Sequence, residues 1–193
     1  MISERIILGI DPGTNVLGYG VLKITGKDVE MVTMGVIDMR RVSDIYLKLG
    51  RIHERVMGII DSFKPDELAI ESPFFGKNPQ TMLKLGRAQG VCIAAAITRD
   101  VPIHEYAPME IKRAITGRGA AAKEQVAEML KRQLRIPQET LDSVPFLDAT
   151  DALAAAYCHH LNTNSPMTRA LGTKKKSNSW AAFVQANKNR IHS

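Results

Sequence analysis

The sequence lacks the features of several large protein classes. It holds only two cysteines in 193 residues, Cys92 and Cys158, and their spacing matches no metal or redox motif. So few cysteines exclude a secreted, disulfide-stabilised scaffold and indicate a reducing compartment. No apolar run approaches the roughly 20 residues that a membrane-spanning helix needs, and no cationic stretch leads into an apolar segment after Met1. We therefore expect a cytoplasmic protein with no membrane partner.

Acidic side chains are missing from the C-terminal end. Residues 161–193 contain six Lys and Arg and no Asp or Glu, so they carry the whole net charge of +6. This stretch is rich in Asn, Ser, Thr and Lys and has little hydrophobic periodicity, which is typical of a mobile segment. We predict one globular domain over residues 1–162 and a basic, flexible tail over residues 163–193.

The charge of the remaining chain is unevenly distributed. Residues 1–71 carry a net charge of −2, residues 72–135 carry +6, and residues 136–160 carry −4. A basic middle between two acid-bearing ends suits a polyanionic substrate held beside a cluster of carboxylates. Charge runs also occur on ordinary solvated surfaces, so charge alone leaves both interpretations open.

Hydrophobic periodicity predicts a strand-rich start followed by alternating strands and helices. Strands are expected at residues 6–10, 19–24, 29–37, 67–71 and 101–106. Helices are expected at residues 45–60, 79–95, 108–116, 123–134 and 146–160. Ser43 is the expected N-cap of the first helix, and residues 137–144 are expected to form a loop. This order predicts an α/β fold with a mixed five-stranded sheet and helices on both faces.

Four acidic residues occupy positions typical of an active site. Asp11 and Glu71 end the first and fourth predicted strands, at the carboxyl ends where functional groups gather in α/β sheets. If these two strands are neighbours, their last side chains can converge. Asp148 and Asp151 are three residues apart on a predicted helix, so they share one face. Such a pair in an alanine-rich helix is costly to bury unless a cation neutralises it.

Four oxygen donors without a Cys or His cluster are typical of a site for a hard cation such as Mg²⁺ or Mn²⁺. Two such ions about 4 Å apart would activate a water and stabilise the leaving oxygen of a phosphodiester. Each acid also has an ordinary structural explanation, in a turn, at a strand end or as a helix cap. Together they favour the catalytic interpretation, because each falls where an active-site group is expected.

The segments around these acids resemble the signature segments of the RuvC family, which are bacterial Holliday junction resolvases. They are Gly9-Ile10-Asp11-Pro12-Gly13-Thr14, Ala69-Ile70-Glu71-Ser72-Pro73-Phe74-Phe75 and Asp148-Ala149-Thr150-Asp151-Ala152-Leu153-Ala154. Residues 84–90 and 105–108 match in the same order, and the resemblance extends from about residue 5 to residue 160. The segment after Asn162 departs from the family core.

The resemblance implies an RNase H-like fold and an endonuclease that makes symmetric paired nicks in four-way DNA junctions during recombination and repair. The nicks would leave 5′-phosphate and 3′-hydroxyl ends. The family's four acids hold two Mg²⁺ ions per active site, replaceable by Mn²⁺, and correspond here to Asp11, Glu71, Asp148 and Asp151. Some members carry His at the third position, so Asp148 implies an all-carboxylate site. The resemblance also implies a homodimer that works with the RuvA–RuvB branch-migration complex.

Further roles follow from the same resemblance. Family lysines needed for cleavage correspond to Lys112 and Lys123, which would neutralise the scissile phosphate or the developing charge. The family aromatic that stacks on junction bases corresponds to Phe74, with Phe75 beside it and core packing as the alternative for both. Expected DNA contacts, with simple surface solvation as the alternative, are Lys77, Asn78, Lys84, Arg87 and Arg118.

Two histidines and the two cysteines are expected to have no catalytic role. His159 lies eleven residues after Asp148, about 16 Å along a helix, which is too far for a shared metal ion. His159 and His160 are therefore expected at the surface. Cys92 and Cys158 are expected to be small core residues.

Other functions remain possible from the sequence. Residues 9–14 and the hairpin after them are similar to the first phosphate loop of the sugar-kinase, actin and heat-shock ATPase superfamily. Those proteins need a duplicated domain, for which 193 residues leave no room, and a second Gly-rich loop does not appear. A junction-binding protein without catalysis is a second alternative, against which the complete set of four acids argues. A nuclease for RNA or for another DNA structure is a third.

Overall fold

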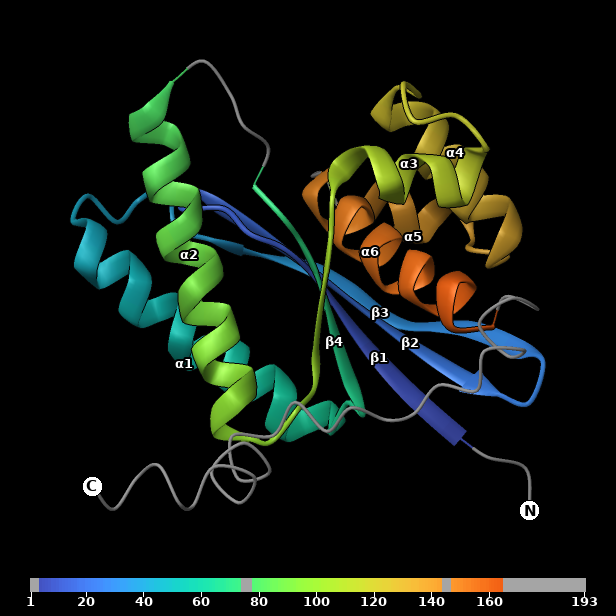
Figure 1. The fold of residues 1–193 in the computed structure, drawn as a ribbon, viewed down its shortest axis with the longest axis horizontal. Helices are drawn as coiled ribbons and strands as arrows, with labels where there is room; N and C mark the ends of the chain where they lie inside the picture. The colour runs from blue at the N-terminus through green and yellow to red at the C-terminus, as the bar shows by residue number, and fades with distance from the viewer. Residues whose placement is uncertain (1–3, 74–77, 144–146, 165–193) are drawn as a thin grey trace, which may run out of the picture.

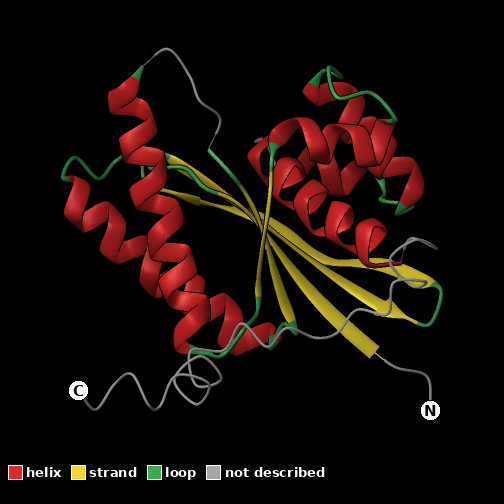
Figure 2. Cartoon of the chain, viewed as in Figure 1, coloured by secondary structure: helices red, strands yellow, loops and turns green. Residues whose placement is uncertain are grey.

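A twisted five-stranded sheet runs through the centre of the molecule, with helices on both faces (Figure 1). This computed structural model describes residues 4–73, 78–143 and 147–164. The strands are β1 (Glu4–Asp11), β2 (Val16–Thr25), β3 (Asp28–Asp38), β4 (Glu67–Glu71) and β5 (Ile103–Tyr106). The helices, red in Figure 2, are α1 (Ile45–Phe63), α2 (Pro79–Thr98), α3 (Pro108–Thr116), α4 (Lys123–Gln133), α5 (Gln138–Ser143) and α6 (Leu147–Asn164).

The sheet has the strand order β3-β2-β1-β4-β5. β2 runs antiparallel to both of its neighbours, whereas β1, β4 and β5 are parallel to one another. The hairpin between β2 and β3 turns at Gly26, whose φ of 65° favours glycine. The predicted mixed five-stranded sheet is therefore confirmed.

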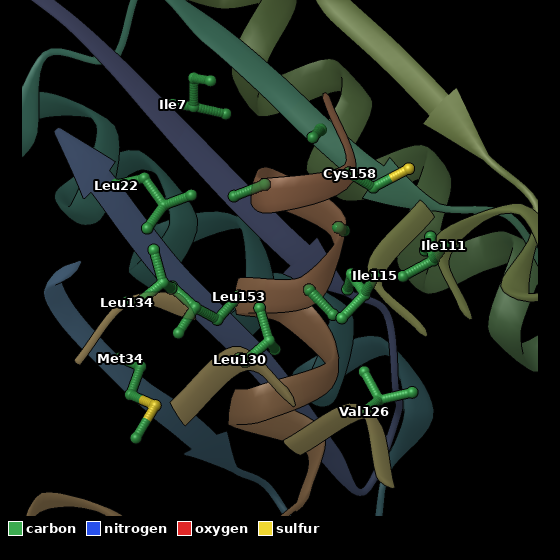
Figure 3. Close-up of a cluster of buried hydrophobic side chains, with 14 of the residues drawn as sticks. Ile7, Leu22, Met34, Ile111, Ile115, Val126, Leu130, Leu134, Leu153 and Cys158 are labelled. Carbon is green, nitrogen blue, oxygen red and sulfur yellow. The ribbon is translucent and has the colours of Figure 1, made fainter. Parts of the chain in front are cut away.

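Two hydrophobic cores lie on the two faces of the sheet. Successive residues of a strand point to opposite faces, so Ile7 enters one core and Leu8 the other. α1 and α2 cover the core that contains Leu8, and α3, α4 and α6 cover the core that contains Ile7 (Figures 1 and 3). Cys92 and Cys158 are fully buried, one in each core, as predicted.

α6 lies very close to β1 and β2 because these strands carry glycine beneath it. A Cβ atom on Gly9 would lie 2.0 Å from the carbonyl oxygen of Ala152, and one on Gly18 would lie 1.9 Å from that of Asp148. Both distances are far below the 3.0 Å that real Cβ atoms keep. Any larger side chain at these positions would push the helix off the sheet.

Three local predictions were wrong. Asp44, not Ser43, caps α1, and its Oδ1 accepts a hydrogen bond from the Leu47 amide at 2.9 Å. Residues 138–143 form α5 instead of a loop, because Pro137 can open a helical turn too short to carry a periodic pattern. α6 also continues to Asn164, beyond the expected end at residue 160.

The adjacent histidines of α6 are buried, which corrects the prediction that they lie at the surface. His159 is 0% exposed and His160 is 9% exposed. α6 packs on the sheet with one side and on α3 and α4 with the other, so most of its circumference is enclosed (Figure 1). A helix that is apolar on all sides is a buried helix, and the run of alanines was the stronger signal.

Residues 165–193, which include nearly all of the predicted tail, lie outside the described residues. The division of the chain at residue 162 therefore stays a prediction. None of the described helices is long and apolar enough to cross a lipid bilayer.

Candidate active site at the carboxyl ends of β1 and β4

The first two acids lie side by side at one edge of the sheet. β1 and β4 are parallel neighbours, and Ile10 pairs with Ile70 in their register. Asp11 and Glu71 are the next residues along each strand, and both are the last residues of their strands. Their convergence was predicted on the condition that the strands are neighbours, and the sheet meets that condition.

The start of α6 brings the other two acids to the same edge. Asp11 pairs with Gly18 of β2, and Gly18 lies directly beneath the Asp148 backbone. Asp148 and Asp151 occupy the first two turns of α6, three residues apart. The Asp151 side chain is only 14% exposed. Glycine in β2 thus allows a helix to place carboxylates against the end of β1.

Burial and mutual repulsion raise the pKa values of Asp11, Glu71 and Asp151. The pKa of Asp11 rises to about 8, chiefly through burial and then through the charges of Glu71 and Asp151. Burial followed by the charge of Asp151 raises the pKa of Glu71 to about 7. The pKa of Asp151 is also raised, again chiefly by burial. Closely spaced, half-buried carboxylates with raised pKa values form a site at which a bound cation would be strongly stabilised.

The two predicted lysines face these acids. Lys123, the first residue of α4, forms an ion pair with Asp151. Although burial opposes it, the hydrogen bond to Asp151 raises the pKa of Lys123. Lys112 of α3 is half-buried, and its charge lowers the pKa values of Glu71 and Asp151. The site therefore combines four acidic side chains with two lysines, and each of these residues lies on an element that was predicted to carry it.

The predicted DNA contacts are more dispersed. Phe74, Phe75 and Lys77 lie outside the described residues. Asn78 caps α2, and its Oδ1 accepts hydrogen bonds from the Gln80 amide at 3.0 Å and the Thr81 amide at 3.3 Å. This side chain therefore has a structural task that explains its presence without DNA.

The remaining predicted contacts lie on the surface of α2 and of the loop after α3. Lys84 and Arg87 are exposed on α2, and Lys84 lines a cavity of about 250 Å³ together with Asn15, four residues after Asp11. Arg118 is exposed after α3 and lines a groove of about 420 Å³ that also contains Glu124. Lys84 thus lies on the side of the molecule that carries the acids, whereas Arg118 lies beside acidic side chains of α4.

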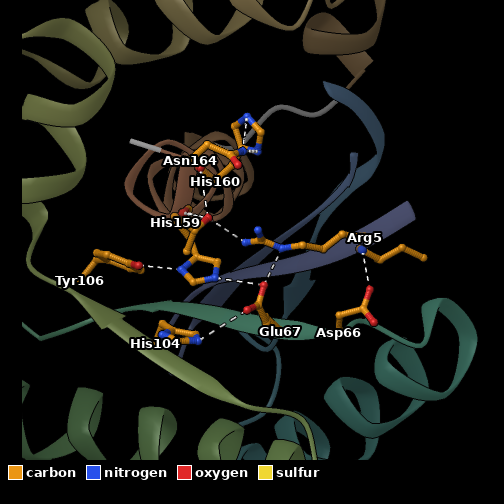
Figure 4. Close-up of polar contacts among 10 residues, drawn as sticks. Arg5, Asp66, Glu67, His104, Tyr106, His159, His160 and Asn164 are labelled. Atoms are coloured by element: carbon orange, nitrogen blue, oxygen red, sulfur yellow. Dashed lines mark hydrogen bonds and ion pairs between the residues drawn. The ribbon is translucent and has the colours of Figure 1, made fainter. Parts of the chain in front are cut away.

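A second polar cluster, which was not predicted from the sequence, lies at the opposite end of β4. Glu67 begins β4, and its carboxylate meets Arg5 of β1, His104 of β5 and the buried His159 of α6 (Figure 4). The ligand atoms of Glu67, His104 and His159 lie within 4.8 Å of one another, which makes them the closest group of this kind within the described ranges. The four acids are not drawn together to that extent, and Asp151 is paired with Lys123 instead.

The signal for this second cluster was present in the sequence. A histidine within an alanine-rich helix and a glutamate that opens an apolar strand are polar residues inside buried elements. Buried polar groups require partners, so the burial of these elements would have indicated a polar residue opposite each of them. Which residues pair could not be read from a sequence in which Glu67 and His159 are 92 positions apart.

Comparison with known proteins relates this arrangement to one family. A family model described as "Crossover junction endodeoxyribonuclease RuvC" matches residues 7–159. A relative of that name from Bacteroides fragilis is 57% identical over 190 residues, covering 98% of this chain and 97% of the relative. Another from Porphyromonas gingivalis is 55% identical over 189 residues, covering 98% of each.

Solved structures give the same relationship. The structure described as "T. thermophilus RuvC in complex with Holliday junction substrate" matches with a TM-score of 0.75 at 32% identity, over 82% of this chain and 94% of that one. A second structure, described as "Thermus thermophilus RuvC structure", matches with a TM-score of 0.72 at 33% identity, over 82% of this chain and 95% of that one. These matches confirm the predicted RNase H-like fold.

Proposed function

The chain belongs to the RuvC family of crossover junction endodeoxyribonucleases, and from that premise we propose that it resolves Holliday junctions by metal-dependent nicking. The observation that carries this proposal is the convergence of Asp11, Glu71, Asp148 and Asp151 at one edge of the sheet. A solved relative is described in complex with a Holliday junction substrate, which supports a four-way junction as the ligand. The activity belongs to DNA recombination and repair.

The cofactor is a pair of Mg²⁺ ions, for which Mn²⁺ can substitute. The donor set fits, because it consists of carboxylate oxygens, the ligands that hard cations prefer. The raised pKa values of Asp11 and Glu71 reflect an excess of negative charge that bound cations would relieve. When bound, the ions supply an activated water and stabilise the charge on the leaving oxygen.

Asp11 is the central member of the four acids. The charges of the other three all raise its pKa, so it lies closest to the middle of their combined field. Asp11, Glu71, Asp148 and Asp151 would together hold the ions, with Asp11 as the central member of the donor set. Lys123 would leave its ion pair with Asp151 when the cations bind. It could then join Lys112 in neutralising the phosphate that is cut.

Paired nicks in two strands require two active sites, which supports a homodimer. Large apolar side chains are exposed on α1 and α2, where Tyr46 is 73%, Leu47 68% and Leu83 58% exposed. Exposed apolar residues of this size favour an interface on this layer. The RuvA–RuvB branch-migration complex is the further partner that we propose, together with junction contacts by Phe74, Phe75, Lys77, Asn78, Lys84, Arg87 and Arg118.

The test uses end-labelled four-way junction DNA, with a linear duplex of the same sequence as control. Each is incubated with the protein, with and without Mg²⁺, and in parallel with Glu71→Gln. We expect symmetric nicks with 5′-phosphate and 3′-hydroxyl ends that require the metal and Glu71. Tight junction binding without nicking under any divalent metal would leave a junction-binding protein. Equal cleavage of both DNAs would exclude junction specificity.

A further inference from the structure

The buried cluster at the amino end of β4 links four elements through a short chain of contacts (Figure 4). Tyr106 Oη lies 2.6 Å from His159 Nδ1. His159 Nε2 lies 3.2 Å from Glu67 Oε2, and the same oxygen lies 2.6 Å from Arg5 Nε. We call Arg5, Glu67, Tyr106 and His159 the α6 anchor, because His159 is the only member that comes from a helix.

The α6 anchor is buried at its centre, and Arg5 adds a second contact with α6, because its Nη2 donates a hydrogen bond to Thr163 Oγ1 at 2.9 Å. Arg5 Nε, Glu67 Oε2 and His159 Nε2 are buried atoms without a hydrogen-bond partner in the described part of the chain, so they meet one another only as ion pairs. His159 itself is 0% exposed. If α6 moved along the sheet, these atoms would lose their mutual contacts without gaining water, which is energetically unfavourable. The helix is therefore held at one position along the sheet.

The distances along the two elements relate this anchor to the candidate active site. Four residues of β4 separate Glu67 from Glu71, which is about 13 Å of strand. Eight residues of α6 separate His159 from Asp151, which is about 12 Å of helix. The spans are nearly equal, so the contact of His159 with Glu67 at one end fixes how Asp151 faces Glu71 at the other.

The surface between these two ends is made of very small residues. Gly9 of β1 meets Ala152 and Ala156 of α6, and Ala69 of β4 belongs to the same core. Such residues allow close approach but provide few interlocking side chains that would resist sliding. The polar contacts at the end of the helix are the stronger determinant of its axial position.

We propose that the α6 anchor sets the axial position of α6 and thereby the spacing at which Asp148 and Asp151 share metal ions with Asp11 and Glu71. His159 is its central positioning residue, because it contacts both Tyr106 and Glu67. This inference rests on the proposed metal-dependent function. It assigns a task in that reaction to residues that never contact the metal or the DNA.

A metal ion bound by the anchor itself is the alternative that the same residues suggest. Glu67, His104 and His159 have the donor types of a transition-metal site. However, the Arg5 guanidinium already neutralises the single carboxylate, and a dication would repel it. The rings of His104 and His159 are also stacked, with centroids 4.2 Å apart and planes at 29°, so they do not converge on one point as ligands would. The geometry favours an anchor without metal.

The chain offers a matched control for the test. His160 is the next residue of α6, is only 9% exposed, and has a polar contact with Asn164 of its own helix. His159→Leu and His160→Leu therefore both remove a buried imidazole from α6, but only the first removes the link to β4 and β5. Mn²⁺ binding to the full-length variants is measured by electron paramagnetic resonance without DNA, and junction nicking is measured in parallel.

We expect His159→Leu to weaken Mn²⁺ binding by about tenfold, as loss of an outer-shell partner does, while His160→Leu leaves it unchanged. Tyr106→Phe keeps the shape of the core and should weaken Mn²⁺ binding by about threefold. If His159→Leu fails to fold, the Mn²⁺ affinity of Tyr106→Phe tests the role of the anchor instead. His159→Gln, which keeps a donor and an acceptor, should restore part of the affinity. Junction binding without metal should not change in any of these variants.

The outcomes separate this inference from the proposed function. If the wild-type protein neither binds Mn²⁺ nor nicks junctions, the proposed function is wrong. If it does both, and His159→Leu and Tyr106→Phe bind Mn²⁺ as tightly as His160→Leu, the anchor does not position the acids. An additional Mn²⁺ or Zn²⁺ site in the wild-type protein that is lost in His104→Ala would also overturn the inference, in favour of a metal site.

Discussion

The two ends of the contact between α6 and the sheet hold buried carboxylates in opposite electrostatic environments. At the carboxyl end of β4, Glu71 lies near Asp11 and Asp151, and the pKa values of Asp11 and Glu71 rise to about 8 and about 7. At the amino end, Arg5 and His159 oppose the effect of burial and lower the pKa of Glu67 to about 2. The same strand thus begins with an acid whose charge neighbouring cations stabilise and ends with an acid whose charge burial and a neighbouring acid disfavour.

This difference separates a residue that stabilises the fold from residues that we propose bind cations. Glu67 is held by its neighbours and contributes to stability as an ion. The four acids at the other end repel one another, which costs stability that a bound cation would return. A cluster that is unfavourable by itself, and is built on well-packed elements, is typical of a functional site.

The largest effect is expected from removing a carboxylate at the end where the acids repel one another. Asp11→Asn keeps the shape but removes the central charge, so the nicking rate on a four-way junction should fall by roughly 10³-fold. Single-turnover nicking with excess protein measures this rate. Junction affinity without metal should be retained, which serves as the control. A Mg²⁺-dependent rate that survives the substitution would contradict the proposed role of Asp11.

Gly18 tests the close approach that brings the helix to the acids. Gly18→Ala places a Cβ atom 1.9 Å from the Asp148 carbonyl oxygen, so α6 must move. We expect a loss of about 3 kcal/mol in the free energy of unfolding and a nicking rate reduced by roughly 10²-fold. Gly86→Ala on α2, with no atom within 4 Å of the added Cβ, is the matched control and should be neutral or stabilising. Equal results for both variants would show that the contact is unimportant.

A charge-removing substitution should have opposite effects on stability at the two ends of β4. Glu67→Gln leaves the Arg5 guanidinium without its partner and should lower the free energy of unfolding by about 2 kcal/mol. Glu71→Gln removes a repelled charge and should leave stability without metal unchanged or raised by about 1 kcal/mol. Urea unfolding of both variants in a chelator at neutral pH measures the difference. Stability losses of equal size would refute the contrast.

The pH dependence of stability tests the same contrast through the sign of its slope. Asp11 and Glu71 have ordinary pKa values of 3.8 and 4.5 but titrate at about 8 and about 7 in the folded protein. The folded state therefore binds more protons than the unfolded state in this range, and these groups lower stability as the pH rises from about 4 to about 8. Glu67 acts in the opposite sense, because its contribution is lost as the pH falls from 4.5 to about 2.

Thermal unfolding between about pH 6 and pH 8 tests this sign. Without divalent metal, the contribution of Asp11 and Glu71 should lower the midpoint as the pH rises, and Mg²⁺ should reduce the decrease. Asp11→Asn should also flatten the profile, since it removes the group with the more strongly raised pKa. A wild-type profile with the same slope in Mg²⁺ and in chelator would count against cation binding by these acids.

Much of the candidate active site could be predicted because its signals are local. An acid at the end of an apolar strand and two acids three residues apart on a helix are visible within a few residues of sequence. The strand order decided whether they meet, and β1 and β4 are neighbours as required. Ser43 and Asp44 show the limit of such reasoning, since both are good helix caps and only the backbone selects Asp44.

The α6 anchor could not be predicted in the same way. Glu67 and His159 are far apart in the sequence, and neither indicates the cluster by itself. A glutamate at the start of a strand is common, and a histidine is a polar residue that is usually expected at the surface. His159 is buried because α6 packs on the sheet there, against Glu67 of β4 and His104 and Tyr106 of β5. Burial of this kind depends on packing between distant segments, which no local pattern records.

The amino-acid sequence by itself determined the five strands, every helix except α5, the four acids near their ends and the family to which the chain belongs. Hydrophobic periodicity, helix caps and sequence motifs are properties of short segments, so they can be recognised without a structure. Only the tertiary structure decided that glycine in β1 and β2 lets α6 approach, that Lys123 pairs with Asp151, and that Glu67 holds His159. These contacts depend on how α6 lies across the sheet, and that position is a property of the whole packed chain.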